Sequence, residues 1–179
     1  MAVLVADLLQ ENGYDVVLTR SQDITCSLSE RINKAHINNA DVFFSIHANA
    51  GPLNLEGIET FFFDVKNIKK EVDCMDIKTR KKAMQTLSAW SLSSKELAQA
   101  VQESVIKMVK KVHPRVVNRG VKPGSCQVLM GFQGPAALIE AGYLTTELEG
   151  ALLQTTDYQK EVAKGICKGI KIFVDKHFS

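Results

Sequence analysis

Short apolar runs that alternate with amphipathic segments predict an α/β protein. The runs are rich in β-branched and aromatic residues, which is typical of buried strands, and most of them contain no alternating polar positions. We therefore expect a three-layer sandwich, in which a mostly parallel, twisted sheet is covered by helices on both faces. The predicted strands are 16–19, 42–46, 58–63, 126–129 and 136–139.

Helical periodicity fills much of the sequence between and after these runs. A first helix is expected at 2–11, ended by Asn12-Gly13. Four further helices are expected to begin at the pattern S/T-x-x-E/Q, in which both side chains satisfy free backbone N–H groups. The four patterns are Ser27 with Glu30, Ser93 with Glu96, Thr146 with Glu149 and Thr156 with Gln159. Residues 119–124, outside these helices, are expected to form a loop.

Residues 64–93 form a long charged connection with scattered apolar positions, among them Val72 and Met75. A connection of this length inside one domain is usually functional or mobile. We predict a helical insertion at 64–93, and a passive surface elaboration is the alternative.

Two chemically active side chains follow buried strands. His47 comes directly after the apolar residues 42–46, and Glu140 follows 136–139. Parallel strands end at the same edge of a sheet, where ligands of open α/β sheets usually bind. A histidine and a glutamate at one edge predict a metal ligand and a general base. The alternative for each is a hydrogen-bonded residue at a strand end without a role in chemistry.

Composition narrows the function further. A chain of 179 residues suits one domain, and a net charge of +2 from 22 basic and 20 acidic residues does not favour nucleic acid as a partner. No apolar run is long enough to span a membrane, and no secretory signal pattern is present. The four cysteines form no CxxC pair, so neither a disulfide framework nor a thiolate zinc site is expected.

Several segments carry a resemblance to a known family. They are 16–20 with 28–31, Phe44-Ser45-Ile46-His47-Ala48-Asn49-Ala50, Gly57-Ile58-Glu59-Thr60, 94–98, Arg119-Gly120-Val121-Lys122, and 135–142 with 147–152. Together they resemble the zinc-dependent N-acetylmuramoyl-L-alanine amidases, which cut bacterial peptidoglycan. The segments follow the family's order and cover nearly the whole chain except 64–93, so we expect a single amidase-like catalytic domain over 1–179.

The resemblance implies a zinc ion (Zn²⁺) held by two histidines and a glutamate, with a further glutamate assisting the attacking water. By position, His47 corresponds to the later histidine ligand and Glu140 to the catalytic glutamate. The family's first histidine lies in an Asp-Pro-Gly-His-Gly-Gly turn, and no His-Gly occurs in this sequence. Two of the three implied ligands are thus absent. We do not expect replacement by the other candidates, which are His36, His113, His177 and Glu11.

These features favour an amino-terminally incomplete amidase that hydrolyses the amide between N-acetylmuramic acid and L-alanine of the stem peptide. The alternative is a catalytically inactive, amidase-like protein that binds peptidoglycan or a partner. A third hypothesis, an unrelated enzyme with Cys126 or Cys26 as nucleophile, has little support. Some members of the family hold a helical insertion over the zinc until an activator protein removes it, so 64–93 is a candidate for such an insertion, on which an activator protein would act. The substrate implies a periplasmic or extracellular location for the full-length protein.

Overall fold

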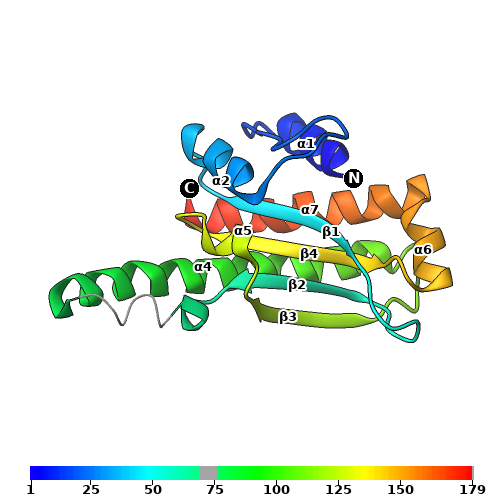
Figure 1. Cartoon of the computed structure of the whole chain (residues 1–179). Coiled ribbons are helices and arrows are strands. Elements are labelled where there is room, and N and C mark those ends of the chain that lie inside the picture. Colours follow the sequence, from blue (N-terminus) through cyan, green and yellow to red (C-terminus); the bar gives the residue numbers. More distant parts are fainter. Residues whose placement is uncertain (69–75, 179) are drawn as a thin grey trace.

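A four-stranded sheet with the order β1-β4-β2-β3 forms the centre of the structure, a computed structural model that describes residues 1–68 and 76–178 (Figure 1). β1 is parallel to β4, and β2 is parallel to β3, while β2 and β4 run antiparallel. The predicted α/β architecture with a mostly parallel sheet is confirmed. The strands are β1 (Phe43–Asn49), β2 (Ile58–Phe63), β3 (Asn118–Gly124) and β4 (Ala136–Tyr143).

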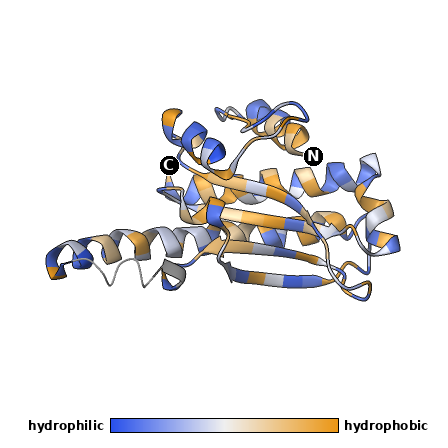
Figure 2. Ribbon diagram, viewed as in Figure 1, coloured by the Kyte–Doolittle hydropathy of each residue, from blue (hydrophilic) through white to orange (hydrophobic). Residues whose placement is uncertain are grey.

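Helices cover both faces of this sheet and form two apolar clusters. The larger cluster lies between the sheet and helices α1, α4 and α7, and the smaller one lies beneath α2 and α5. Figure 2 shows apolar residues along β1, β4 and β2, whereas β3 at the edge is mainly hydrophilic. The helices are α1 (Ala2–Glu11), α2 (Leu28–Ile37), the 3₁₀ turn η1 (Val65–Ile68), α4 (Ile77–Val109), α5 (Gln127–Met130), α6 (Glu147–Leu153) and α7 (Thr156–His177).

Helices α4 and α7 pack against each other closely because α7 has two glycines at the contact. A Cβ atom on Gly165 would lie 2.5 Å from the Cα of Val105, and one on Gly169 would lie 2.4 Å from the Cα of Val101. Both distances are far below van der Waals contact, so any larger side chain would push the helices apart. This close packing covers the centre of the face of the sheet opposite to α2.

Three predictions about strands are wrong. Residues 16–19 belong to no strand and make no backbone–backbone hydrogen bonds to other described residues, so their β-branched composition alone does not make a ladder. Residues 126–129 are largely helical, as α5, because a short apolar run fits either structure. The expected loop at 119–124 belongs to β3, where Pro123 is tolerated because β3 is an edge strand.

One of the four expected capping boxes does not begin a helix, and another, at Thr146, begins α6 as predicted but without the expected side-chain hydrogen bonds. Ser93 lies in the middle of α4, where its hydroxyl donates to the carbonyl of Ala89 at 3.0 Å, and α4 begins instead at Asp76. Glu149 turns inward from α6 rather than capping it. The Ser27 box is present as expected, while α7 is capped by Thr155, one residue before the prediction.

The described part of the expected insertion is helical from Ile77 onward and continues into the rest of α4 without a break. In Figure 1 this first half of α4 runs beyond the sheet, on the side where β2 ends and β4 begins. Val72 and Met75 lie outside the described residues. Among the described residues, no helix combines the length and the apolar composition needed to cross a bilayer.

Candidate functional site

His47 and Glu140 lie next to each other on neighbouring strands. They are directly paired in the parallel β1–β4 ladder, and Glu140 is also paired with Glu59 in the antiparallel β4–β2 ladder. Directly paired residues point to the same face, and neighbouring strands lie about 4.8 Å apart. His47, Glu140 and Glu59 therefore form a row across three strands, which we call the polar row.

The polar row continues the face of the sheet that α2 and α5 cover. Leu138, two positions before Glu140 on β4, packs in the smaller apolar cluster together with its antiparallel partner Phe61, which lies two positions after Glu59 on β2. Glu59 is buried, Glu140 is partly buried, and His47 is exposed. The row thus begins under the protein surface and opens toward solvent at β1.

Glu140 has the most unusual environment of the three. Its Oε2 atom is buried and has no hydrogen-bond partner among the described residues. Burial and the negative charge of Glu59 raise the pKa of Glu140 to about 7. A carboxyl group with a pKa near neutrality and a vacant oxygen can take up and release a proton under physiological conditions, as a general base requires.

The imidazole of His47 is biased toward its neutral form. Partial desolvation by the surrounding protein and the positive charge of Arg31 lower the pKa of His47 below its ordinary value. A neutral imidazole has a free nitrogen lone pair, which a metal ligand or a hydrogen-bond acceptor needs. Its exposure leaves this nitrogen accessible to a ligand from solvent.

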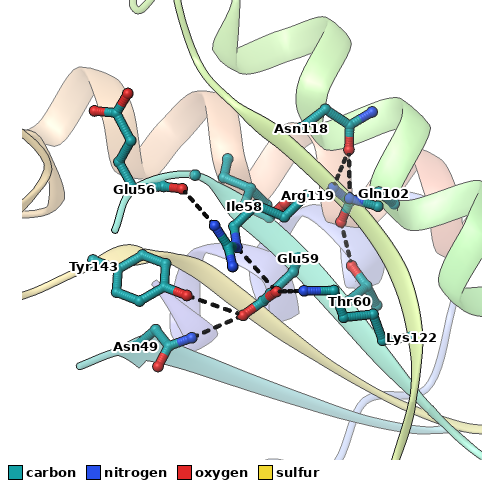
Figure 3. A network of polar contacts seen from close by, with 12 residues as sticks. Asn49, Glu56, Ile58, Glu59, Thr60, Gln102, Asn118, Arg119, Lys122 and Tyr143 are labelled. Atoms are coloured by element: carbon teal, nitrogen blue, oxygen red, sulfur yellow. Dashed lines mark hydrogen bonds and ion pairs between the residues drawn. The ribbon is translucent and has the colours of Figure 1, made fainter. Parts of the chain in front are cut away.

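Glu59 is the centre of a network of polar contacts (Figure 3). Its Oε1 atom accepts hydrogen bonds from Asn49 Nδ2 at 3.0 Å and from the Tyr143 hydroxyl at 3.3 Å. Its Oε2 atom accepts from Arg119 Nε at 3.1 Å and from Lys122 Nζ. Burial acts to raise the pKa of Glu59, but hydrogen bonds and charges from both cations outweigh it and lower that pKa. Glu59 is therefore held as a carboxylate.

A second buried carboxylate fixes the backbone around this network. Glu149 of α6 accepts hydrogen bonds from the backbone N–H groups of Gly57 and Tyr143, each at 2.8 Å. Gly57 lies two residues before Glu59 and has a φ of +113°, which favours glycine. Glu149 thereby connects the start of β2 to the end of β4, which carry two of the network's members.

The described residues do not supply a complete zinc site. Among them, no group of three or more His, Cys, Asp or Glu side chains could hold a metal ion. The polar row offers His47 and Glu140, whereas catalytic zinc takes three protein ligands. The other histidines have other surroundings, since His36 stacks on Phe132 and His177 Nε2 lies 2.7 Å from a carboxylate oxygen of Glu96.

The cysteines do not have the properties of a nucleophile. Cys126 lies at the start of α5, and burial followed by the negative charge of Glu140 raises the pKa of its thiol. A nucleophilic cysteine needs a lowered pKa. Cys26 has weak contacts to the backbone carbonyl groups of Thr19 and Ser27. The hypothesis of a cysteine enzyme is not supported by these surroundings.

Sequence reasoning placed His47 and Glu140 at the site but gave no separate role to the residues around them. Glu59 could have been noticed, because an acid inside an aromatic strand needs partners when it is buried. Nothing local identifies those partners, which come from other strands. The partners of Glu59 are Asn49, Arg119, Lys122 and Tyr143, and Glu149 of α6 holds the backbone of Tyr143 beside them.

An α/β sheet with a histidine and a glutamate side by side on parallel strands suits a hydrolase of the amidase class. The chain belongs to the N-acetylmuramoyl-L-alanine amidase family Amidase_3, whose model matches residues 1–172. It is 29% identical to the N-acetylmuramoyl-L-alanine amidase LytC of Bacillus subtilis, over 90% of this chain but only 27% of that protein.

Solved structures agree with this family. The catalytic domain of the amidase CwlV from Bacillus (Paenibacillus) polymyxa var. colistinus is 28% identical, with a TM-score of 0.76 over 97% of this chain and 80% of that one. The CwlD amidase from Clostridioides difficile, solved in complex with the GerS lipoprotein, is 27% identical, with a TM-score of 0.70 over 97% of this chain and 82% of that one.

Proposed function

We propose that this chain is the amidase domain of a peptidoglycan hydrolase, which cuts the amide between N-acetylmuramic acid and the L-alanine of the stem peptide. The observation that carries the proposal is the direct pairing of His47 with Glu140 at the open side of the sheet. Family membership supplies the substrate class. Because peptidoglycan lies outside the cytoplasmic membrane, we propose a periplasmic or extracellular site of action.

In this proposal Glu140 is the general base. Its carboxylate takes a proton from a water molecule as the water oxygen attacks the amide carbonyl, and the same proton then passes to the nitrogen of L-alanine as the C–N bond breaks. A pKa of about 7 suits both halves of this transfer, because the group is about half ionised at neutral pH. The Oε2 atom, which has no hydrogen-bond partner in the part of the chain that the structure describes, can accept this proton.

His47 is proposed as a metal ligand, in keeping with its lowered pKa. Zinc activation of the attacking water is implied by the family resemblance and stays a prediction. It requires two more protein ligands beside His47 than the described residues place there. The residues that the structure describes therefore do not by themselves fit a catalytic zinc ion.

The test is hydrolysis of purified peptidoglycan, followed by mass spectrometry of released stem peptides with a free L-alanine amino group. We expect Glu140→Gln and His47→Ala each to lower the rate by about 100-fold or more. Glu103→Gln on the exposed face of α4 is the matched control and should keep the rate. Full activity in Glu140→Gln would refute the role of this residue.

The incomplete ligand set favours a second candidate, a binding protein of the amidase fold without hydrolysis. The two candidates differ in metal content and in activity. About one equivalent of zinc in the purified 179-residue protein, together with hydrolysis, would exclude the inactive form. Sedimentation with insoluble peptidoglycan without zinc and without released peptides would support it.

We also propose 64–93 as the contact for an activator or another protein partner. The CwlD structure shows that a related amidase binds a lipoprotein. The described first half of α4 runs beyond the sheet (Figure 1) and has exposed apolar residues, such as Ile77 and Leu92. In this arrangement it does not cover the polar row, so a partner would act by another route than uncovering Glu140.

A further inference from the structure

The solvent side of the Glu59 network is cationic. The side chain of Glu59 is 4% exposed, whereas those of Arg119 and Lys122 are 25% and 41% exposed. The carboxylate thus lies beneath the protein surface, and the two cations lie between it and the solvent. A molecule that approaches this part of the sheet meets positive charge first.

The network also contains one more cation than it neutralises. Arg119 and Lys122 share a single oxygen of Glu59, and the other oxygen is occupied by the neutral donors Asn49 and Tyr143. Arg119 is further fixed by its guanidinium group, which lies 5.5 Å from the centre of the Tyr143 ring. A fixed guanidinium and a half-exposed ammonium are the groups that recognise carboxylates in proteins.

The position of these cations relative to Glu140 is defined by the sheet. Glu59 is on β2, next to Glu140, and Lys122 is on β3, one strand further and paired with Phe61. With strands about 4.8 Å apart, the cations lie roughly 5–10 Å from the general base. An extended peptide spans about 3.3–3.6 Å per residue, so this separation corresponds to roughly one and a half to three residues.

We propose that Arg119 and Lys122 form a subsite for a carboxylate of the substrate. The inference rests on the proposed function, because it places the cut amide at Glu140. In the stem peptide the residue after L-alanine is D-glutamate, linked through its γ-carboxyl, so its α-carboxylate is free at the required distance. The subsite then selects stem peptides in which this group is an acid rather than an amide.

The test compares two ligands that differ only at this group, N-acetylmuramoyl-L-alanyl-D-glutamate and N-acetylmuramoyl-L-alanyl-D-isoglutamine. Affinities are measured by calorimetric or NMR titration in a Glu140→Gln background, so that neither ligand is cut. We expect the acid to bind about 3- to 10-fold more tightly than the amide, as a partly exposed charge pair allows. Lys122→Gln should remove most of this preference.

Lys168→Gln, an exposed lysine of α7, is the matched control and should leave the preference unchanged. Circular dichroism establishes that both variants are folded. Equal affinity for acid and amide, a preference that survives Lys122→Gln, or failure to bind either ligand would overturn the subsite. Sedimentation with purified peptidoglycan, measured on the same preparation, tests the proposed function separately. If the protein still binds peptidoglycan, a negative result counts against the subsite alone. If it does not, the result counts against the subsite and the proposed function.

Discussion

Glu59 and Glu140 occupy directly paired positions on the antiparallel strands β2 and β4. Two carboxyl groups at this separation do not ionise independently, and the surroundings decide which one keeps the charge. Arg119 and Lys122 contact Glu59 and lower its pKa, while burial and the charge of Glu59 raise the pKa of Glu140 to about 7. The pair thus consists of a permanent carboxylate and a group that exchanges its proton near neutral pH.

This pairing predicts a pH-dependent stability of the metal-free protein. The pKa of Glu140 is raised on folding, so the folded state holds a proton between about pH 4.5 and 7 that the unfolded state has lost. The stabilising contribution of the protonated Glu140 to the free energy of unfolding is therefore fully present below pH 4.5 and is lost as the pH rises to 7. We expect Glu140→Gln to increase the free energy of unfolding above pH 7 by up to about 3 kcal/mol.

Urea unfolding from pH 4 to pH 8 in the presence of a chelator measures this effect. The gain from Glu140→Gln should grow between pH 4.5 and 7 and stay constant above that range. Glu103→Gln should show no such dependence, because this residue lies on an exposed helix face. A gain that does not vary with pH would contradict the raised pKa.

Removal of the charge on Glu59 should lower the free energy of unfolding, which is opposite to the effect expected for Glu140→Gln. Glu59→Gln leaves Arg119 and Lys122 without their carboxylate and places an amide N–H group among donors. Because Glu59 is buried but its cationic partners are partly exposed, we expect a loss of about 2–4 kcal/mol in the free energy of unfolding at pH 7. Chemical denaturation measures it, and a loss below about 0.5 kcal/mol would contradict a structural role for the network.

The contrast between Glu140 and Glu59 shows what the sequence could predict about the site. His47 and Glu140 each follow an apolar run, so a local pattern was sufficient to place both at one edge of a parallel sheet, while their direct pairing came from the structure. Glu59 has partners from β1, β3 and β4 that lie up to 84 residues away. Such pairings depend on strand order, and strand order was not derivable from periodicity.

The elements that were mispredicted fail for equally specific reasons. The motif Ser93-x-x-Glu96 satisfies the capping pattern, but a serine can also donate to the carbonyl four residues earlier inside a helix. Residues 119–124 contain two glycines and a proline, which normally indicate a loop, yet an edge strand needs hydrogen bonds on one side only. In both cases tertiary contacts override the local signal.

Two substitutions distinguish between two possibilities, a continuous α4 and a helix that begins at Ser93. Asp76 caps α4 by accepting from the N–H groups of Lys78 and Thr79, both at 3.1 Å. We expect Asp76→Ala to reduce the helicity of the first half of α4 and to cost about 0.5–2 kcal/mol in helix stability. Ser93→Ala should have almost no effect, because its hydroxyl donates within the helix. Circular dichroism and backbone chemical shifts measure both, and a large loss from Ser93→Ala would indicate that the predicted cap exists.

The contact between α4 and α7 gives a prediction about packing. Gly169→Ala would place a methyl group 2.4 Å from the Cα of Val101, where only backbone movement can relieve the overlap. We expect a loss of about 1–3 kcal/mol in the free energy of unfolding, although alanine favours the helix more than glycine does. Lys168→Ala, the neighbouring exposed position, is the control and should change stability by no more than about 0.5 kcal/mol. Thermal unfolding of the two variants compares these effects directly.

The outer edge of β1 gives the last prediction, since β1 pairs with β4 on one side only among the described strands. Residues 16–19 belong to no strand and have no backbone–backbone hydrogen bond to the described residues. Their amides should exchange with solvent on the order of 100-fold faster than those of β4, which is paired on both sides. Hydrogen exchange read by NMR measures this, with the amides of α7 as a protected reference. Protection of 16–19 equal to that of β4 would mean that these residues pair with another strand in solution. If that strand were β1, which carries His47, the pairing would bring further side chains to the polar row and would alter its capacity to hold a metal.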